Sequence, residues 1–112
     1  MRSLKSLIEK HSKVWFYCGT EDLKKRFLEQ AEEEGFITMR GEKPSSLSFQ
    51  RLYGINDKGT MGYIPNFLWF LSLQTGSNEI LHVDYDRFIS GEEDYISQGP
   101  HMKPVSCEIQ RI

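Results

Sequence analysis

The sequence has few cysteines, no excess of basic residues and no long apolar run. Its two cysteines, Cys18 and Cys107, exclude a disulfide-rich scaffold, and we expect both to be free thiols of a cytoplasmic chain. The 14 basic and 16 acidic residues give a formal net charge of −2, which offers no basic footprint for direct binding of nucleic acid. The longest apolar run, FLWFLSL at 67–73, is far too short to cross a bilayer, and charges within the first twelve residues exclude a signal peptide.

The sequence also lacks a glycine-rich loop of the kind that binds phosphate. The stretch VWFYCGTED at 14–22 has one glycine and no Lys followed by Ser or Thr. Glu21 and Asp22 would stand where the first N–H groups of a helix face an anion, and they complement the helix dipole themselves. We therefore interpret this stretch as a strand that leads into a helix with Thr20 as its N-cap. No base is placed beside Cys18, so we expect a buried structural cysteine rather than a nucleophile.

What is present predicts an α+β fold: a small, mostly antiparallel sheet of four or five strands, with one main helix packed on one face and a short N-terminal helix. We assign a single domain to 1–96 and an irregular tail to 97–112. The expected helices span 3–12 and 21–34. The expected strands span 13–18, 36–39, 48–56, 60–74 and 80–88, and the first of them lies in the middle of the sheet because it is apolar on both sides.

Local signals define the ends of these elements. Ser3 is the candidate N-cap of the first helix, and Gly35 ends the second. In the second helix Leu23, Phe27 and Ala31 recur every four residues, so we expect Phe27 to face the sheet. Gly54 indicates a bulge or a close approach, and the turn sequence NDKG at 56–59 predicts an antiparallel return. TGSNE at 75–79 predicts another turn.

The segment 60–74 is the most apolar part of the chain and leaves two alternatives open. A strand is favoured because the apolar residues share one parity: Met61, Tyr63, Phe67, Trp69, Leu71 and Leu73. Pro65 interrupts this pattern and indicates a bulge, an edge or a break into two elements. A helix over 66–74 is the alternative, since short apolar runs do not distinguish a strand from a helix.

The segment 80–88 alternates between apolar and polar residues, which predicts a strand with one wet face. Leu81, Val83 and Tyr85 are expected to point inward, and His82, Asp84 and Asp86 outward. The three outward residues could in principle ligate a metal, but no second element supplies further ligands. We therefore predict no metal and no cofactor.

The acidic loop GEEDY at 91–95 follows that strand directly. A solvated loop is one interpretation of it. A docking patch for a basic partner is the functional alternative, with Tyr95 as an aromatic anchor. The candidate binding residues are Asp84, Asp86, Glu92, Glu93, Asp94 and Tyr95.

The run from VWFYCGTEDLKKRFLEQAEEEGF through GEKPSS to YGIND resembles small uncharacterised α+β proteins of phages, prophages and other mobile elements of Firmicutes. Their common pattern is a strand, a helix that reads approximately E-x-x-x-x-F-L-x-x-A-E-x-E-G-F, and a loop with G-x-x-P. The similarity covers about residues 13–95. Chains of this kind include inhibitors of host defence, so the resemblance implies a function of that type in the cytoplasm of a bacterial host cell.

Three functions follow as hypotheses. The leading one is a non-enzymatic inhibitor of a host defence protein, most concretely of the anti-CRISPR type, which occupies the basic groove of a nuclease. The second is a sponge that sequesters a small nucleotide signal as an oligomer, with Tyr53, Arg51 or Lys58 at its site. The third is a small enzyme, which the lack of a catalytic constellation disfavours. We expect no direct nucleic-acid or membrane partner, and a homo-oligomer is possible.

Overall fold

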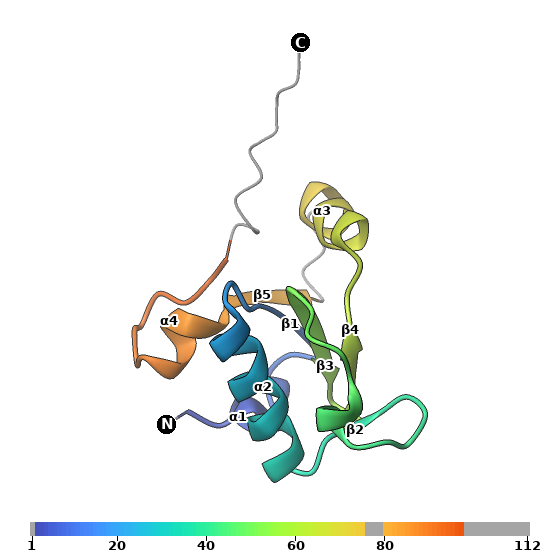
Figure 1. Cartoon of the computed structure of the whole chain (residues 1–112). Coiled ribbons are helices and arrows are strands. Elements are labelled where there is room, and N and C mark those ends of the chain that lie inside the picture. Colours follow the sequence, from blue (N-terminus) through green and yellow to red (C-terminus); the bar gives the residue numbers. More distant parts are fainter. Residues whose placement is uncertain (1, 76–79, 98–112) are drawn as a thin grey trace.

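The computed structural model describes residues 2–75 and 80–97, and these residues form a five-stranded sheet with helices on both faces (Figure 1). The strands follow the order β2-β4-β3-β1-β5. β1 lies between β3 and β5, which confirms the central position that its apolar character predicted. The strands are β1 (Lys13–Tyr17), β2 (Ile37–Thr38), β3 (Leu52–Asn56), β4 (Thr60–Tyr63) and β5 (Ile80–Asp84).

The sheet is mixed, so the prediction of a mostly antiparallel sheet is wrong. β3 runs antiparallel to β1 and to β4, and the second of these pairs confirms the return predicted from NDKG. However, β5 is parallel to β1, and β2 is parallel to β4. Parallel strands need a long crossover between them. These two pairs therefore join segments that are distant in sequence, and no local pattern could reveal them.

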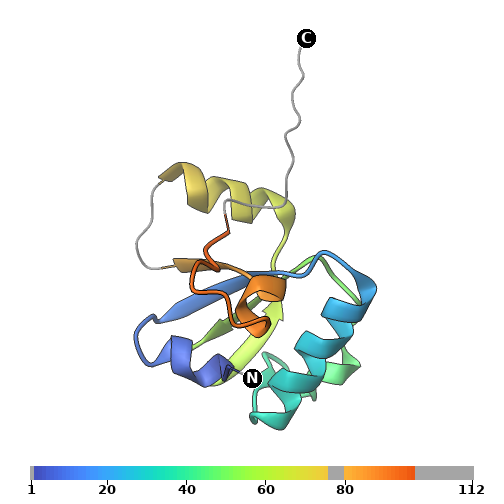
Figure 2. The same cartoon turned by 90° about the vertical axis from the view of Figure 1, so that its left-hand side faces the viewer.

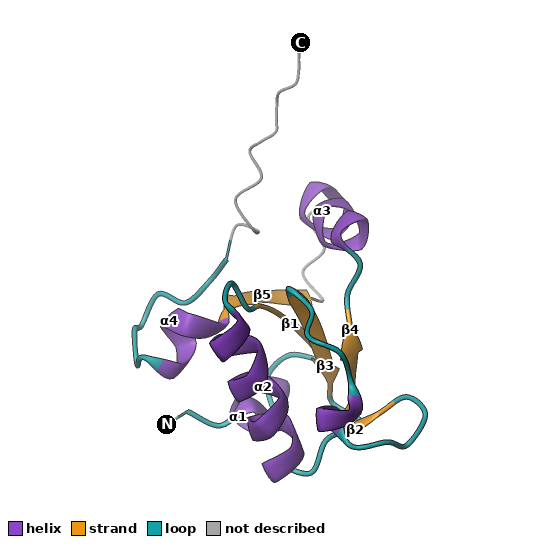
Figure 3. Cartoon of the chain, viewed as in Figure 1, coloured by secondary structure: helices purple, strands orange, loops and turns teal. Residues whose placement is uncertain are grey.

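The helices lie in two layers, one on each side of the sheet (Figures 2 and 3). One side carries α1 (Leu4–Ile8), α2 (Glu21–Glu33) and α4 (Tyr85–Ile89), whereas α3 (Asn66–Thr75) lies on the other. A short 3-10 helix, η1 (Pro44–Ser46), forms within the predicted loop before β3. None of the helices in the described part of the chain has the length and apolar character that crossing a bilayer requires.

The ends of α2 form as the sequence predicts. The Thr20 side chain accepts a hydrogen bond from the Leu23 backbone N–H at 3.2 Å, so VWFYCGTED is a strand, a cap and a helix. Gly35 ends the helix with a φ of +89°, a conformation that side chains disfavour. Phe36 then donates its N–H to the Ala31 carbonyl at 3.0 Å, which closes the last turn.

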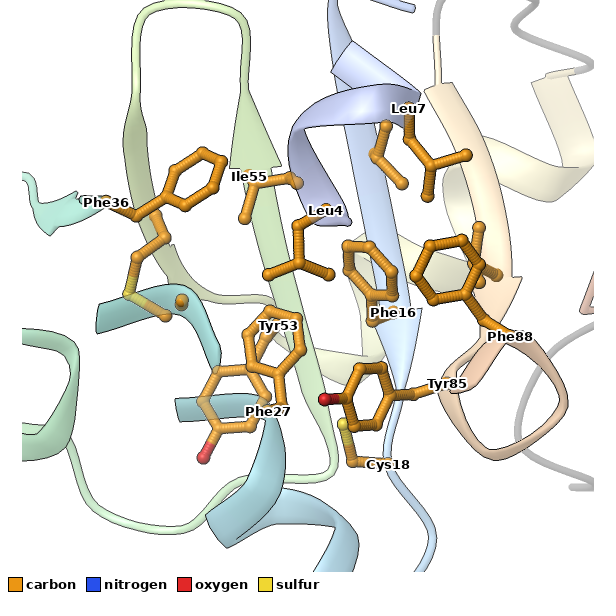
Figure 4. Packing of buried hydrophobic residues seen from close by; sticks show 14 of the residues in the cluster. Leu4, Leu7, Phe16, Cys18, Phe27, Phe36, Tyr53, Ile55, Tyr85 and Phe88 are labelled. Carbon is orange, nitrogen blue, oxygen red and sulfur yellow. The ribbon is translucent and has the colours of Figure 1, made fainter. Parts of the chain in front are cut away.

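The main core lies between the sheet and the layer of α1, α2 and α4 (Figure 4). Phe27 is fully buried at its centre, as its spacing predicted. Its ring centroid lies 5.0 Å from the centroids of both Phe16 and Tyr53, and 5.3 Å from that of Tyr85. Aromatic pairs at such distances add stabilisation beyond the burial of their area. The core therefore depends on aromatic side chains from β1, β3, α2 and α4.

The carboxylate of Glu34 joins the end of α2 to the start of α1. It accepts hydrogen bonds at 2.9 Å from the backbone N–H groups of Leu4 and Lys5, from the Ser3 hydroxyl and from the Gln30 amide. Burial raises the pKa of Glu34, but these hydrogen bonds together bring it below its usual range. Ser3 is the N-cap of α1 as predicted, and Glu34 supports that cap from a second helix.

The favoured strand at 60–74 is wrong beyond Tyr63, and the alternative helix is the observed structure. β4 ends at Tyr63, and α3 begins at Asn66, directly after Pro65. Proline has no N–H to donate within a sheet, whereas its carbonyl can open a helix. The Pro65 carbonyl accepts from the N–H of Leu68 at 3.1 Å and of Trp69 at 3.3 Å. The common parity of the apolar residues was therefore not evidence for one strand.

The strand predicted at 80–88 is also shorter than expected. It ends at Asp84, whose side chain accepts hydrogen bonds from the N–H groups of Asp86 and Arg87 and so caps α4. His82 does not face water as predicted, because α3 covers that side of β5, and only 7% of the residue is exposed. Val83 and Tyr85 are buried as expected. Of the turn predicted at 75–79, Thr75 still belongs to α3 and 76–79 lie outside the described residues, as does the tail from 98 onward.

Candidate protein-binding surface

The second face of the sheet, which carries α3, is only partly covered. Trp69 is fully buried and brings α3 onto β1 and β5. Its ring centroid lies 6.4 Å from that of Trp15, in a stacked arrangement, and 4.8 Å from that of His82, edge to face. α3 therefore covers the β1–β5 half of this face, and none of the residues in 2–75 and 80–97 covers the β3–β4 half.

A buried Ser–His pair lies under α3. Ser72 Oγ and His82 Nε2 are 2.7 Å apart, and only 8% and 7% of the two residues are exposed. Burial lowers the pKa of His82, against a smaller raising effect of its hydrogen bond to the Ile80 backbone, so the ring is neutral near pH 7. The pair resembles a nucleophile with its base, but a substrate would have to displace α3 to reach it. Because Ser72 belongs to α3 and His82 to β5, the hydrogen bond between them holds α3 on the sheet.

The outer side of α3 presents large apolar side chains to solvent. Phe67 is 68% exposed, Leu71 is 51% exposed and Leu68 is 37% exposed. We call these three residues the apolar stripe. The helix sequence NFLWFLSLQT contains no charged residue and six large apolar ones, so apolar side chains stand on its exposed side as well as on its buried side. Exposed apolar surface of this kind marks sites of interaction more often than free surface.

An open groove of about 260 Å³ lies on the uncovered half of the same face. Its floor includes Gly54 of β3 and Gly62 of β4, which are paired directly across the ladder. Trp15 and Ile64 line it together with Met39, a residue that follows β2 and is 81% exposed. Ile64 is two residues before α3, so the groove and the apolar stripe belong to adjacent parts of one face.

The six candidate residues named from the sequence fall into three settings. Glu92, Glu93 and Asp94 are exposed in the loop after α4, as a docking patch requires. Asp86 is also exposed, whereas the Asp84 carboxylate is engaged in capping α4 and lies 3.9 Å from the Arg87 guanidinium. These acidic residues are neighbours because they lie along one continuous segment. They do not line a common pocket among those of the described residues.

Tyr95 is turned toward the molecule instead of outward. Its ring packs edge to face on Phe88, with centroids 5.3 Å apart, and the Arg2 guanidinium lies 5.0 Å above it. Arg2 also donates hydrogen bonds to the backbone carbonyls of Glu92 and Gly91, the latter at 3.1 Å. Tyr95 therefore anchors the acidic loop to its own domain, and its half-buried ring leaves little surface for a partner.

Other residues considered for chemistry are structural. Cys18 is buried, and burial raises the pKa of its thiol far above the ordinary range, so it is not a thiolate. Tyr53, considered for nucleotide stacking, is buried against Phe27, and its hydroxyl donates to the Ser48 carbonyl at 3.0 Å. Burial raises the pKa of Tyr53 to about 12. Over 2–75 and 80–97 there is no group of three or more His, Cys, Asp or Glu side chains that could hold a metal.

Comparison with known proteins adds no relative to this picture. No protein-family model matches the chain, and neither a curated protein nor a solved structure does so.

The interpretation of the sequence missed the apolar stripe and the groove. One signal for the stripe was present, because a run of apolar residues after Pro65 exceeds what one side of a ten-residue helix can bury. For the groove the signal was the glycine at position 62, within a short strand and away from any turn.

Proposed function

We propose that this protein is a non-enzymatic inhibitor of a host defence factor, most concretely of the anti-CRISPR type, and that it acts by binding a protein. The observation that carries the proposal is the apolar stripe of α3. Phe67 and Leu71 stand one turn apart on the exposed side of a helix without charge. A helix face of this kind binds by entering an apolar groove of its partner.

The acidic loop supplies the charged part of the proposed interface. Glu92, Glu93 and Asp94 are exposed, so their charges are accessible to the basic groove of a nuclease. Charges at the rim of an interface mainly increase the association rate and make it dependent on salt. We therefore assign most of the affinity to the apolar stripe and the long-range attraction to the loop.

The settings of the reactive side chains support a binding role over an enzymatic one. The Cys18 thiol is buried, and the Ser72–His82 pair is covered by α3. A nucleophile and its base have to reach a substrate, and neither of these groups has such access. The nucleotide sponge is supported less, because Tyr53 belongs to the core.

The test is a phage infection assay in bacteria that carry one CRISPR nuclease and a matching guide. We expect the wild-type chain to restore plaque formation and the purified chain to block DNA cleavage by the nuclease. The double variant Phe67→Asp with Leu71→Asp should lose both effects, because it places charge in the centre of the interface. Phe49→Asp is the matched control, since Phe49 is a comparably exposed apolar residue beside α2 and outside the apolar stripe.

The acidic loop is tested by the triple variant Glu92→Gln, Glu93→Gln and Asp94→Asn, whose binding kinetics are measured on the same nuclease. Association with the purified nuclease should become slower and less dependent on ionic strength, while dissociation stays unchanged. Inhibition by the α3 double variant equal to that of wild type would refute the assignment of the interface. If no nuclease were inhibited by the wild-type chain, the proposed function itself would be wrong.

A further inference from the structure

Gly62 has no explanation within the described residues. It lies within β4, has no positive φ, and a Cβ at this position would meet no atom of the described residues within 4 Å. Gly54, its partner across the ladder, differs in this respect. A Cβ there would lie 2.9 Å from both Ile64 Cδ1 and Trp15 Cδ1, so internal packing requires a glycine. Glycine weakens a strand, and it often marks a place where an external group approaches the backbone.

The groove above Gly62 has the size of one large side chain. Its volume of about 260 Å³ is below the range of roughly 300–1,000 Å³ that is typical of pockets for whole small molecules. The strand order places Trp15 of β1 beyond Gly54 on one side and Met39, after β2, on the other. An indole ring and a thioether are both favourable neighbours of an aromatic ring.

The charge at the groove is positive. Lys13 is the only charged residue that lines it among the described residues, and its side chain is exposed. The polar side chain of Asn56 is already engaged, because it donates to Thr60 Oγ1 at 2.6 Å and accepts from the Lys58 N–H at 3.0 Å. A carboxylate next to an aromatic residue is therefore the complement of this site.

We propose that the groove receives an aromatic side chain of the target protein, and that a carboxylate on the adjacent target residue pairs with Lys13. This inference rests on the proposed function and names the chemistry that the target has to offer. The ring would lie over Gly62 between Trp15 and Met39, and the lack of a Cβ at Gly62 would let it reach the backbone. The apolar stripe of α3 would contact the same partner beside this anchor.

The experiment uses the full chain labelled with 15N and three blocked dipeptides at millimolar concentration. The dipeptides are acetyl-Phe-Asp-amide, acetyl-Phe-Lys-amide and acetyl-Ala-Asp-amide. The first should shift the amide signals of Gly54 and Gly62 and the indole N–H of Trp15 in a saturable manner. It should bind roughly three to five times more tightly than the Lys peptide, which is the effect expected of one exposed ion pair. The Ala peptide should cause no saturable shift.

Two variants test the two halves of the site. Gly62→Leu fills the open space and should weaken binding of acetyl-Phe-Asp-amide at least about tenfold, a change well within the resolution of such titrations. Its denaturation midpoint should be equal to or above that of wild type, which separates blocked binding from misfolding. Lys13→Glu should reverse the preference between the Asp and Lys peptides, whereas the matched control Lys10→Glu, outside the groove, should leave it unchanged.

Three results would overturn the inference. The first is the absence of shifts at Gly54 and Gly62 with the Phe-Asp peptide. The second is equal binding by Gly62→Leu and wild type. The third is a dependence of these signals on protein concentration without peptide, lost in Gly62→Leu, which would assign the groove to a second copy of the chain. In each case the phage assay with the α3 variant still decides the proposed function separately.

Discussion

Replacement of Phe27 by alanine tests whether α2 is held on the sheet by the aromatic cluster. Phe27 is fully buried, and its ring lies within 5.0–5.3 Å of the rings of Phe16, Tyr53 and Tyr85, measured between centroids. Truncation of a buried Phe to Ala typically lowers the free energy of unfolding by about 3–5 kcal/mol. Three aromatic neighbours lose a partner at once, so we expect a value in the upper part of that range, about 4–5 kcal/mol.

The measurement is urea denaturation followed by far-UV circular dichroism at 25 °C. A domain of this size has a free energy of unfolding of about 5–15 kcal/mol, so Phe27→Ala can leave almost no folded protein if the wild type lies at the lower end. Phe27→Leu keeps most of the side-chain volume and should lower the free energy by about 1–2 kcal/mol, within reach of the same assay. The slope of the free energy against urea concentration should not change.

Lys25→Ala is the control on the same helix. Lys25 is exposed, so this change should alter the free energy of unfolding by less than about 0.5 kcal/mol. If Phe27→Ala lowered the free energy of unfolding by less than about 1 kcal/mol, the reasoning would be refuted, since truncation of a side chain at the centre of the cluster should cost more. It would mean that the α2 layer does not close the core in solution.

Three further changes test other parts of the structure. Glu34→Gln should lower the free energy of unfolding by about 1 kcal/mol at pH 7. Because the pKa of Glu34 is lowered in the folded state, this stabilisation is present above about pH 4.3 and is lost as the pH falls through the lowered value, so the variant should show a flatter pH dependence. Tyr85→Phe removes the 2.6 Å hydrogen bond to Gln30 Oε1 and should cost about 1–3 kcal/mol in urea denaturation, and a loss near zero would contradict the role of this bond. Cys18 should react with a thiol reagent only after unfolding, and fast reaction in the native state would contradict its burial.

The segment from β1 through α2 could be predicted from sequence because several local signals agree there. A β-branched and aromatic run, an N-cap at Thr20, a four-residue apolar repeat and Gly35 all indicate the same elements. Each signal acts within a few residues, so none depends on distant parts of the chain. The burial of Phe27 follows from the same repeat.

The errors arise where the answer depends on distant contacts. The parallel pairing of β1 with β5 joins strands more than sixty residues apart, and the sequence of neither strand indicates which strand it pairs with. His82 alternates as a residue on a wet face would, and only the position of α3 buries it. The candidate site shows the same limit, since Trp15, Met39 and Gly62 meet through the strand order and not through spacing.

The two faces of the sheet differ in what their apolar residues can contribute to stability. On the side of α2, the large side chains are buried in the core and stabilise the fold through burial. On the side of α3, Phe67, Leu71 and Met39 remain largely exposed, so they gain little from folding and increase the tendency to associate. A net charge of −2 gives only weak protection against such association. Phe67, Leu71 and Met39 are thus poorly covered by the described residues, and the proposed partner would have to fit on this open half of the sheet.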